Sequence, residues 1–198
     1  DEFEPGEREI EKPTVCPECG ANLIERGAHL FCPNRDGCKK QIVMRLSHFA
    51  GREAMDIETF SEKTAEQLVN LNLIQEADQL YALEKEQLAG LDRFGEKKAE
   101  NLIRAIEKSK TPKLSAFIYA IGIPNVGVKT ARDLADRFGT IDALRAADAE
   151  TLTGMDDVGE IVAESIRAFF ADPASARLVD ALLAAGVQPQ SPEKIAFG

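Results

Sequence analysis

The sequence has 198 residues, of which 44% are hydrophobic and 29% are charged, a balance typical of a folded globular chain. Its net charge of −10 argues at first against a nucleic-acid partner. The acidity, however, is concentrated at the two ends: residues 93–137 hold 10 basic and 5 acidic side chains, a net charge of +5. A local basic segment matters more to a binding face than the total charge, so nucleic-acid binding is not excluded.

Neither end of the sequence reads as part of a packed domain. Residues 1–15 carry six acidic and two basic side chains and have neither the basic nor the apolar region of a secretion signal. Residues 189–198 contain Pro189 and Pro192 and follow the last apolar pattern. We expect both segments to be linkers within a longer protein. No apolar run approaches the roughly 18 residues that span a bilayer, so we expect no membrane segment.

All four cysteines fall within residues 16–41, as Cys16-x2-Cys19 and, twelve residues later, Cys32-x5-Cys38. Two short loops that each carry a pair of thiolates supply the four ligands of a tetrahedral zinc site. Such a site is structural, because four protein sulfurs leave no open position for a water. Two disulfides are an alternative, and so is a site in which His29 replaces one cysteine. The sequence therefore predicts a small zinc ribbon.

Residues 42–188 form an internal repeat of helix, tight turn and helix, which predicts a mainly α fold. Four anchor positions are spaced by 34, 32 and 32 residues. An apolar residue precedes each anchor, and an alanine and a branched apolar residue follow it by four and seven positions, on one helical face. Thr111-Pro112 divides the units into two pairs. The anchors are Ser61, Gly95, Gly127 and Gly159, in units near 46–70, 84–110, 113–138 and 148–171.

This pattern predicts helix-hairpin-helix units that bind the DNA backbone irrespective of base sequence. The first turn of each second helix presents unpaired N–H groups and the positive end of the helix dipole, which suit a phosphate. Glycine at an anchor permits a positive φ and the close approach of another backbone. Lysines follow three of the four hairpins. The predicted DNA-binding residues are Ser61, Lys63, Gly95, Lys97, Lys98, Gly127, Lys129, Arg132 and Gly159.

Two hairpins depart from this pattern. Asp156, Asp157 and Glu160 flank the fourth, for which we expect weak DNA binding or packing alone. The first has Thr59 and Ser61 at positions where glycine would be comfortable. Plain αα-hairpins with glycines as C-caps are the alternative interpretation of all four units.

A four-cysteine ribbon followed by four such units resembles the C-terminal half of bacterial NAD-dependent DNA ligases, over about residues 10–190. The resemblance implies a non-catalytic part that holds nicked duplex DNA during replication and repair, in the bacterial cytoplasm with the nucleoid. It implies a structural zinc and makes residues 1–15 the exit from an oligonucleotide-binding domain and residues 189–198 the path to a BRCT domain. The segments that carry it are Cys16–Gly20 with Cys32 and Cys38, Asp56–Ile57 with Glu62–Leu68, Phe94–Leu102, Ile121–Gly127 and Val158–Ile166.

In that family, NAD and magnesium act in a catalytic half that would lie outside this sequence. The adenylated lysine belongs to a Lys-x-Asp-Gly motif, which does not occur here, so we expect the chain to be inactive alone and to partner the adenylation and oligonucleotide-binding domains. Two other functions compete. A helix-hairpin-helix glycosylase would need an acidic catalytic residue, for which only Asp142 is suitably spaced. A zinc and helical-repeat scaffold that binds protein is the other.

Overall fold

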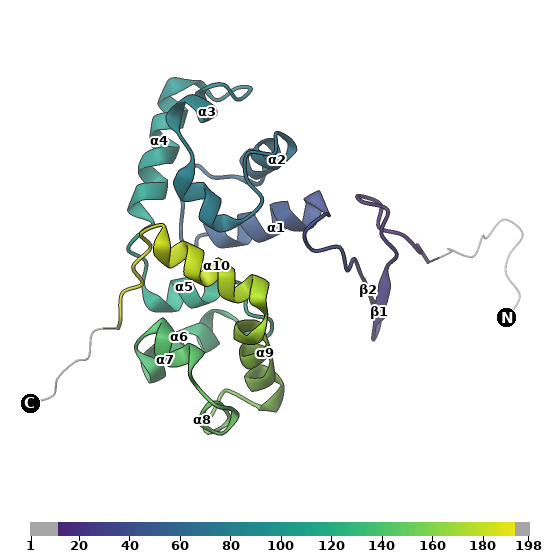
Figure 1. The fold of residues 1–198 in the computed structure, drawn as a ribbon, viewed down its shortest axis with the longest axis vertical. Helices are drawn as coiled ribbons and strands as arrows, with labels where there is room; N and C mark the ends of the chain where they lie inside the picture. Colours follow the sequence, from purple (N-terminus) through teal and green to yellow (C-terminus); the bar gives the residue numbers. More distant parts are fainter. Residues whose placement is uncertain (1–11, 193–198) are drawn as a thin grey trace, which may run out of the picture.

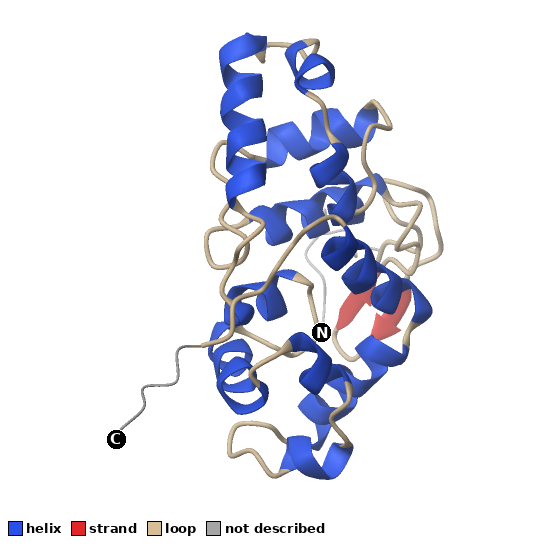
Figure 2. Cartoon of the chain, turned by 60° about the vertical axis from the view of Figure 1, so that its left-hand side comes forward, coloured by secondary structure: helices blue, strands red, loops and turns tan. Residues whose placement is uncertain are grey.

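The computed structural model describes residues 12–192 (Figure 1). The outer parts of both expected linkers, residues 1–11 and 193–198, therefore lie outside the described residues. The cysteine-rich segment contains an antiparallel hairpin of β1 (Ile24–Arg26) and β2 (His29–Phe31). Figure 1 shows this hairpin to one side of a helical body, and Figure 2 shows no other sheet in the described part of the chain.

Two helical hairpins make up the first half of the body, where α1 packs against α2 and α3 against α4. The first helix begins at Lys39, inside the segment expected to be zinc ribbon, because Cys38 serves as its N-cap. The expected start of the first unit near residue 46 is therefore too late. The elements are α1 (Lys39–Ala50), α2 (Glu62–Asn70), the 3-10 helix η1 (Ala77–Ala82), α3 (Lys85–Ala89) and α4 (Gly95–Lys108).

The second half repeats this arrangement, with α5 packed on α6 and α8 packed on α9. A short helix lies between the two hairpins, as η1 does in the first half. The predicted mainly α fold with paired helix-hairpin-helix repeats is confirmed. The elements are α5 (Leu114–Ala120), α6 (Val128–Phe138), α7 (Ile141–Arg145), α8 (Ala149–Thr153) and α9 (Glu160–Ala171).

The last helix, α10 (Pro173–Ala184), joins the two halves, because it packs against both η1 and α9. Its N-cap is Asp172, whose carboxylate accepts hydrogen bonds from the backbone N–H and the hydroxyl of Ser175, at 3.1 and 2.8 Å. Pro173 fills the first helical position, where its missing N–H is not needed.

The sequence predicts a linker from residue 189 onward, but the chain remains hydrogen-bonded to the helical body beyond that residue. The N–H groups of Gln188 and Gln190 donate to the carbonyls of Lys110 and Pro112, both at 2.7 Å. The Leu114 N–H donates back to the Gln190 carbonyl at 2.8 Å. The prediction is therefore wrong for the first residues of this segment. Pairing through main-chain groups leaves no periodic apolar pattern from which it could have been read.

The positions that define the repeat are the core of the helical body. The four alanines that follow the anchors, and the branched residues three positions later, are all at most 2% exposed. Small alanines on these faces let the two helices of a hairpin approach closely. A single cluster of buried apolar side chains extends from Ile42 to Val187. Among the described residues, no helix is both long and apolar enough to cross a membrane.

Candidate metal centre and nucleic-acid interface

The four cysteine sulfurs converge on one point of the cysteine-rich segment. All four Sγ atoms lie within 4.8 Å of one another, and the Cys16–Cys38 and Cys19–Cys32 pairs are separated by 4.0 and 3.5 Å. Tetrahedral zinc with sulfurs at about 2.3 Å requires separations of about 3.8 Å. The donor set and its spacing therefore suit a four-thiolate metal site.

Turns in the two loops set the positions of these sulfurs. The Cys16 N–H donates to the Ala21 carbonyl and the Gly20 N–H donates to the Cys16 carbonyl, both at 2.8 Å. Gly20 has a φ of +76°, a left-handed conformation that glycine adopts without steric cost. In the second loop, the Cys38 N–H donates to the Asn34 carbonyl at 2.9 Å. Tight turns of this kind direct both cysteines of a loop towards one ion.

The structure supports neither of the alternatives to a four-cysteine site, which are two disulfides and a site with His29 as a ligand. All four cysteines are free rather than disulfide-bonded. His29 is exposed in β2 and stacks edge-on against Phe31, outside the group of converging ligands.

The thiols of this group differ in pKa. The pKa of Cys19 is lowered to about 7, chiefly by the hydrogen bond from the Ala21 N–H. The pKa of Cys32 is raised to about 11, chiefly by burial. A metal that binds all four sulfurs must therefore displace at least the Cys32 proton.

Three of the four hairpins share a backbone feature that the sequence did not reveal. Two residues before the anchor, Thr59, Arg93 and Asn125 all have φ between +62° and +69°. The equivalent Asp157 of the fourth hairpin is not in this conformation. The expectation that the anchor glycines supply the positive φ holds for Gly95, at +69°, and is wrong for the two later ones.

Gly127 and Gly159 instead have φ of −90° and −83°, which any residue can adopt. A Cβ at either position would meet no atom within 4 Å. The fold therefore does not require glycine at these two anchors. Glycine at these anchors leaves open space at the N-termini of α6 and α9.

The N-termini of the second helices are capped in different ways. In the first hairpin, the Ser61 hydroxyl accepts a hydrogen bond from the Thr64 N–H at 3.2 Å, so this helix satisfies one of its own first-turn donors. Within residues 12–192, no side chain caps α4, α6 or α9. Because three of the four helices leave these donors free of side-chain caps, they can accept an external anion.

Polar contacts join the hairpins in two pairs. The Gln67 side chain of α2 donates to the Asp92 carbonyl in the second hairpin at 3.1 Å. In the second half, the Asn125 amide donates to the Ser165 hydroxyl at 2.7 Å, and Lys129 Nζ lies 2.8 Å from the Asp157 carboxylate. The sequence predicts that Lys129 binds DNA and gives no sign of this partner, because nothing in the repeat relates the two positions.

All nine residues predicted to bind DNA are exposed in the structure. Lys97 follows the uncapped start of α4, and the ammonium of Lys98 lies 4.5 Å from the centre of the Phe94 ring. The hydrogen bond and charge of Asp157 raise the pKa of Lys129, and Lys129 in turn lowers the pKa of Asp157. Lys129 is thus the one predicted DNA-binding residue that forms an ion pair within residues 12–192.

The glycosylase interpretation finds no support at Asp142. This residue is exposed in the first turn of α7, where a carboxylate stabilises a helix by its position at the positive end of the dipole. Asp78 holds the equivalent position in the first turn of η1. A structural role at the start of these two short helices therefore accounts for the residue.

Comparison with known proteins gives the same division of the chain. Residues 52–108 match the SAM-like helix-hairpin-helix tandem family, and residues 116–179 match the helix-hairpin-helix motif family. The DNA ligase of Clostridium perfringens is 52% identical over 189 residues, which are 96% of this chain and 28% of that protein. The DNA ligase of Alkaliphilus metalliredigens is 53% identical over 182 residues, 92% of this chain and 28% of the relative. The chain thus spans about 28% of the length of these relatives.

Proposed function

Because this chain belongs to the DNA ligase family through a segment that spans only 28% of its relatives' length, we propose that it is the part of an NAD-dependent ligase that holds nicked duplex DNA. The observation that carries the proposal is the pair of uncapped, unobstructed helix N-termini at Gly127 and Gly159. Such termini bind phosphate through main-chain N–H groups, which read no bases.

The choice of glycine at these positions supports a ligand rather than a purely structural role. Serine or aspartate is the more stabilising residue at an N-cap, and the backbone at both sites would accept either. A side-chain oxygen there would occupy the space and the donors that a phosphate needs, as the Ser61 hydroxyl does in the first hairpin. Glycine keeps the site free for the DNA backbone.

The metal that we propose for the four cysteines is zinc. Four thiolates in tetrahedral spacing favour zinc over oxygen-seeking ions such as magnesium. A closed site of this kind supplies no chemistry when occupied and holds the two loops together. Residues of this chain would thus bind and orient DNA, while NAD and magnesium would act in the adenylation and oligonucleotide-binding domains of the same protein, in the bacterial cytoplasm.

The experiment is a fluorescence-anisotropy titration of labelled nicked and intact duplexes with the zinc-loaded chain at 50 and 200 mM salt. Phosphate contacts predict binding that weakens steeply with salt, by about 0.9 log units per log unit of salt for each phosphate contacted, with little dependence on base sequence. A nick-directed grip predicts tighter binding to the nicked duplex than to the intact one.

Absence of binding at low salt to either duplex would contradict the proposal for this chain. The titration would then be repeated in the presence of the remaining part of a homologous ligase. If no DNA affinity appeared there either, the protein scaffold would be the better account. Release of a base from damaged duplex would support the glycosylase.

A further inference from the structure

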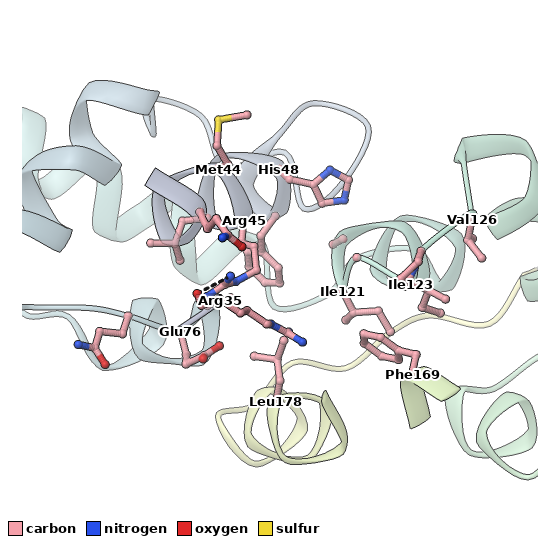
Figure 3. A pocket seen from close by; sticks show the side chains of 18 of the residues that line it. Arg35, Met44, Arg45, His48, Glu76, Ile121, Ile123, Val126, Phe169 and Leu178 are labelled. Carbon is pink, nitrogen blue, oxygen red and sulfur yellow. Dashed lines mark hydrogen bonds between the residues drawn. The ribbon is translucent and has the colours of Figure 1, made fainter. Parts of the chain in front are cut away.

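A cavity of about 590 Å³ lies between α1, the start of η1, the third hairpin and the last two helices (Figure 3). Its volume falls within the range of small-molecule sites, roughly 300–1,000 Å³. The walls include the apolar side chains of Phe49, Ile121, Ile123, Phe169 and Leu178. The DNA-binding function proposed above makes no use of this space.

One end of the cavity carries charged groups. Arg45, from α1, donates through Nη1 to the Arg35 carbonyl at 2.9 Å (Figure 3). Its other terminal nitrogen, Nη2, is buried and has no hydrogen-bond partner in residues 12–192. Arg35 lies 3.9 Å from the Asp172 carboxylate, whereas Arg45 has no carboxylate within 4.0 Å in the same part of the chain. Arg45 thus places a guanidinium at the cavity wall, and one of its two terminal nitrogens, Nη2, has no acceptor in residues 12–192.

Such a group requires an explanation, because a buried donor without a partner is unfavourable, and more so when it is charged. Glu76 also lines the cavity and does not neutralise Arg45 at ion-pair distance. Burial is the largest effect on the Glu76 carboxyl and raises its pKa, against the opposing effect of the Arg45 and Arg35 charges. Arg35, Lys40 and Arg45 line the same space, so it is net positive.

We propose that this cavity binds an organic anion, with its carboxylate or phosphate beside the Arg45 guanidinium and its apolar body between Phe49, Ile121 and Leu178. An oxygen acceptor would pair with the positive charge of this guanidinium, and an aliphatic or aromatic body would cover the apolar walls. The third hairpin lines the cavity as far as Val126, next to the α6 N-terminus, whereas Gly127 and Gly159 themselves are not among the lining residues.

The test uses 8-anilinonaphthalene-1-sulfonate, an aromatic anion that fluoresces when it leaves water, and N-phenyl-1-naphthylamine, an uncharged relative. Arg45→Met keeps an unbranched, flexible side chain, which is shorter, and removes its charge and its hydrogen-bond donors. Arg52→Met removes a charge from an exposed position outside the cavity and is the matched control. Three competitors that share a ten-carbon chain are then used to displace the sulfonate. Decanoate and decyl phosphate show which anionic group the cavity prefers, and decanol shows how much of the binding comes from the apolar chain alone.

We expect the sulfonate to bind with 1:1 stoichiometry and Arg45→Met to weaken its binding about tenfold or more. The affinity of the uncharged probe should change less than twofold, and Arg52→Met should leave both affinities unchanged. Equal affinity of the sulfonate for the unmodified chain and Arg45→Met would overturn the proposal.

An amide-resolved NMR titration of the unmodified chain with the sulfonate keeps the proposal testable if Arg45→Met fails to fold. Shifts that centre on Ala120–Ile123 and Leu178 would support it. Shifts confined to other parts of the chain would rule it out. DNA affinity enters neither measurement, so failure here would not bear on the DNA-binding proposal.

Discussion

At the level of single residues, the anchors differ in what they leave open at the first turn of the helix. Ser61 caps its own helix with a hydroxyl, whereas Gly127 and Gly159 leave the first turn uncapped and the space around it empty. The sequence repeat alone treats these positions as equivalent. Their local hydrogen bonds predict that the third and fourth hairpins offer main-chain donors to phosphate and that the first does so less.

Replacing Ser61 with glycine tests this difference. The substitution removes the hydrogen bond to the Thr64 N–H and opens the first helix terminus. The free energy of unfolding should fall by only about 0.3 kcal/mol, because glycine is itself an acceptable N-cap. The affinity for duplex DNA, measured by anisotropy, should rise. A loss of affinity would show that the hydroxyl itself contacts DNA.

The thiols predict a pH dependence of metal binding. The raised pKa of Cys32, about 11, keeps this group protonated at neutral pH in the metal-free chain, so zinc binding must release its proton. Protons therefore compete with the metal more strongly as the pH falls. Zinc affinity, measured against a chromogenic chelator and corrected for the chelator's own protonation, should rise about tenfold or more per pH unit from 6.5 to 8.5. An affinity that does not change over this interval would contradict a four-thiolate site.

At the level of elements, the sequence predicted the repeated helical hairpins, because the alanines and branched residues of the repeat are the buried faces of the helices. It could not predict how the hairpins contact each other. The Lys129–Asp157 ion pair joins two units through exposed side chains, and exposed charges follow no periodicity. The same reason explains why Lys129 was assigned to DNA without its partner.

Asp157→Asn tests what this ion pair does. The neutral side chain removes the nearer of the two carboxylates beside the Lys129 ammonium and leaves Asp133 at 3.9 Å, so DNA affinity should increase by about two- to tenfold. The slope of log affinity against log salt should also become steeper by about 0.9, which corresponds to one further phosphate contact. Asp156→Asn, which removes a neighbouring charge with no ion-pair partner in the described chain, should leave the slope unchanged. Weaker binding by Asp157→Asn would mean that the pair positions the two hairpins instead.

At the level of the whole molecule, the cysteine-rich segment and the helical body are held together by few contacts. The buried apolar cluster begins at Ile42 and includes none of the cysteines. The links across the boundary are polar: Gln41 donates to the Cys32 carbonyl at 2.8 Å and Arg45 to the Arg35 carbonyl at 2.9 Å. Cysteine spacing predicted the ribbon from the sequence, but these side-chain to main-chain contacts have no sequence signature.

Loss of the metal should therefore loosen one part of the molecule only. Cys32→Ser should release zinc and leave the helical signal in circular dichroism within a few per cent of its original value, since the core of the body does not involve the ribbon. Chelation of zinc from the unmodified chain is the matched treatment. Cooperative loss of helicity in both cases would show that the ribbon is integral to the helical core.

The measurement that tests the central claim most directly is the DNA affinity and thermal stability of Gly127→Ser/Gly159→Ser. Serine should cap α6 and α9 as Ser61 caps α2, so the melting temperature should stay equal or rise slightly. Affinity for a nicked duplex should nevertheless fall at least about tenfold, because the donors and the space for phosphate are taken. Unchanged affinity in a stably folded variant would contradict phosphate binding at these helix N-termini.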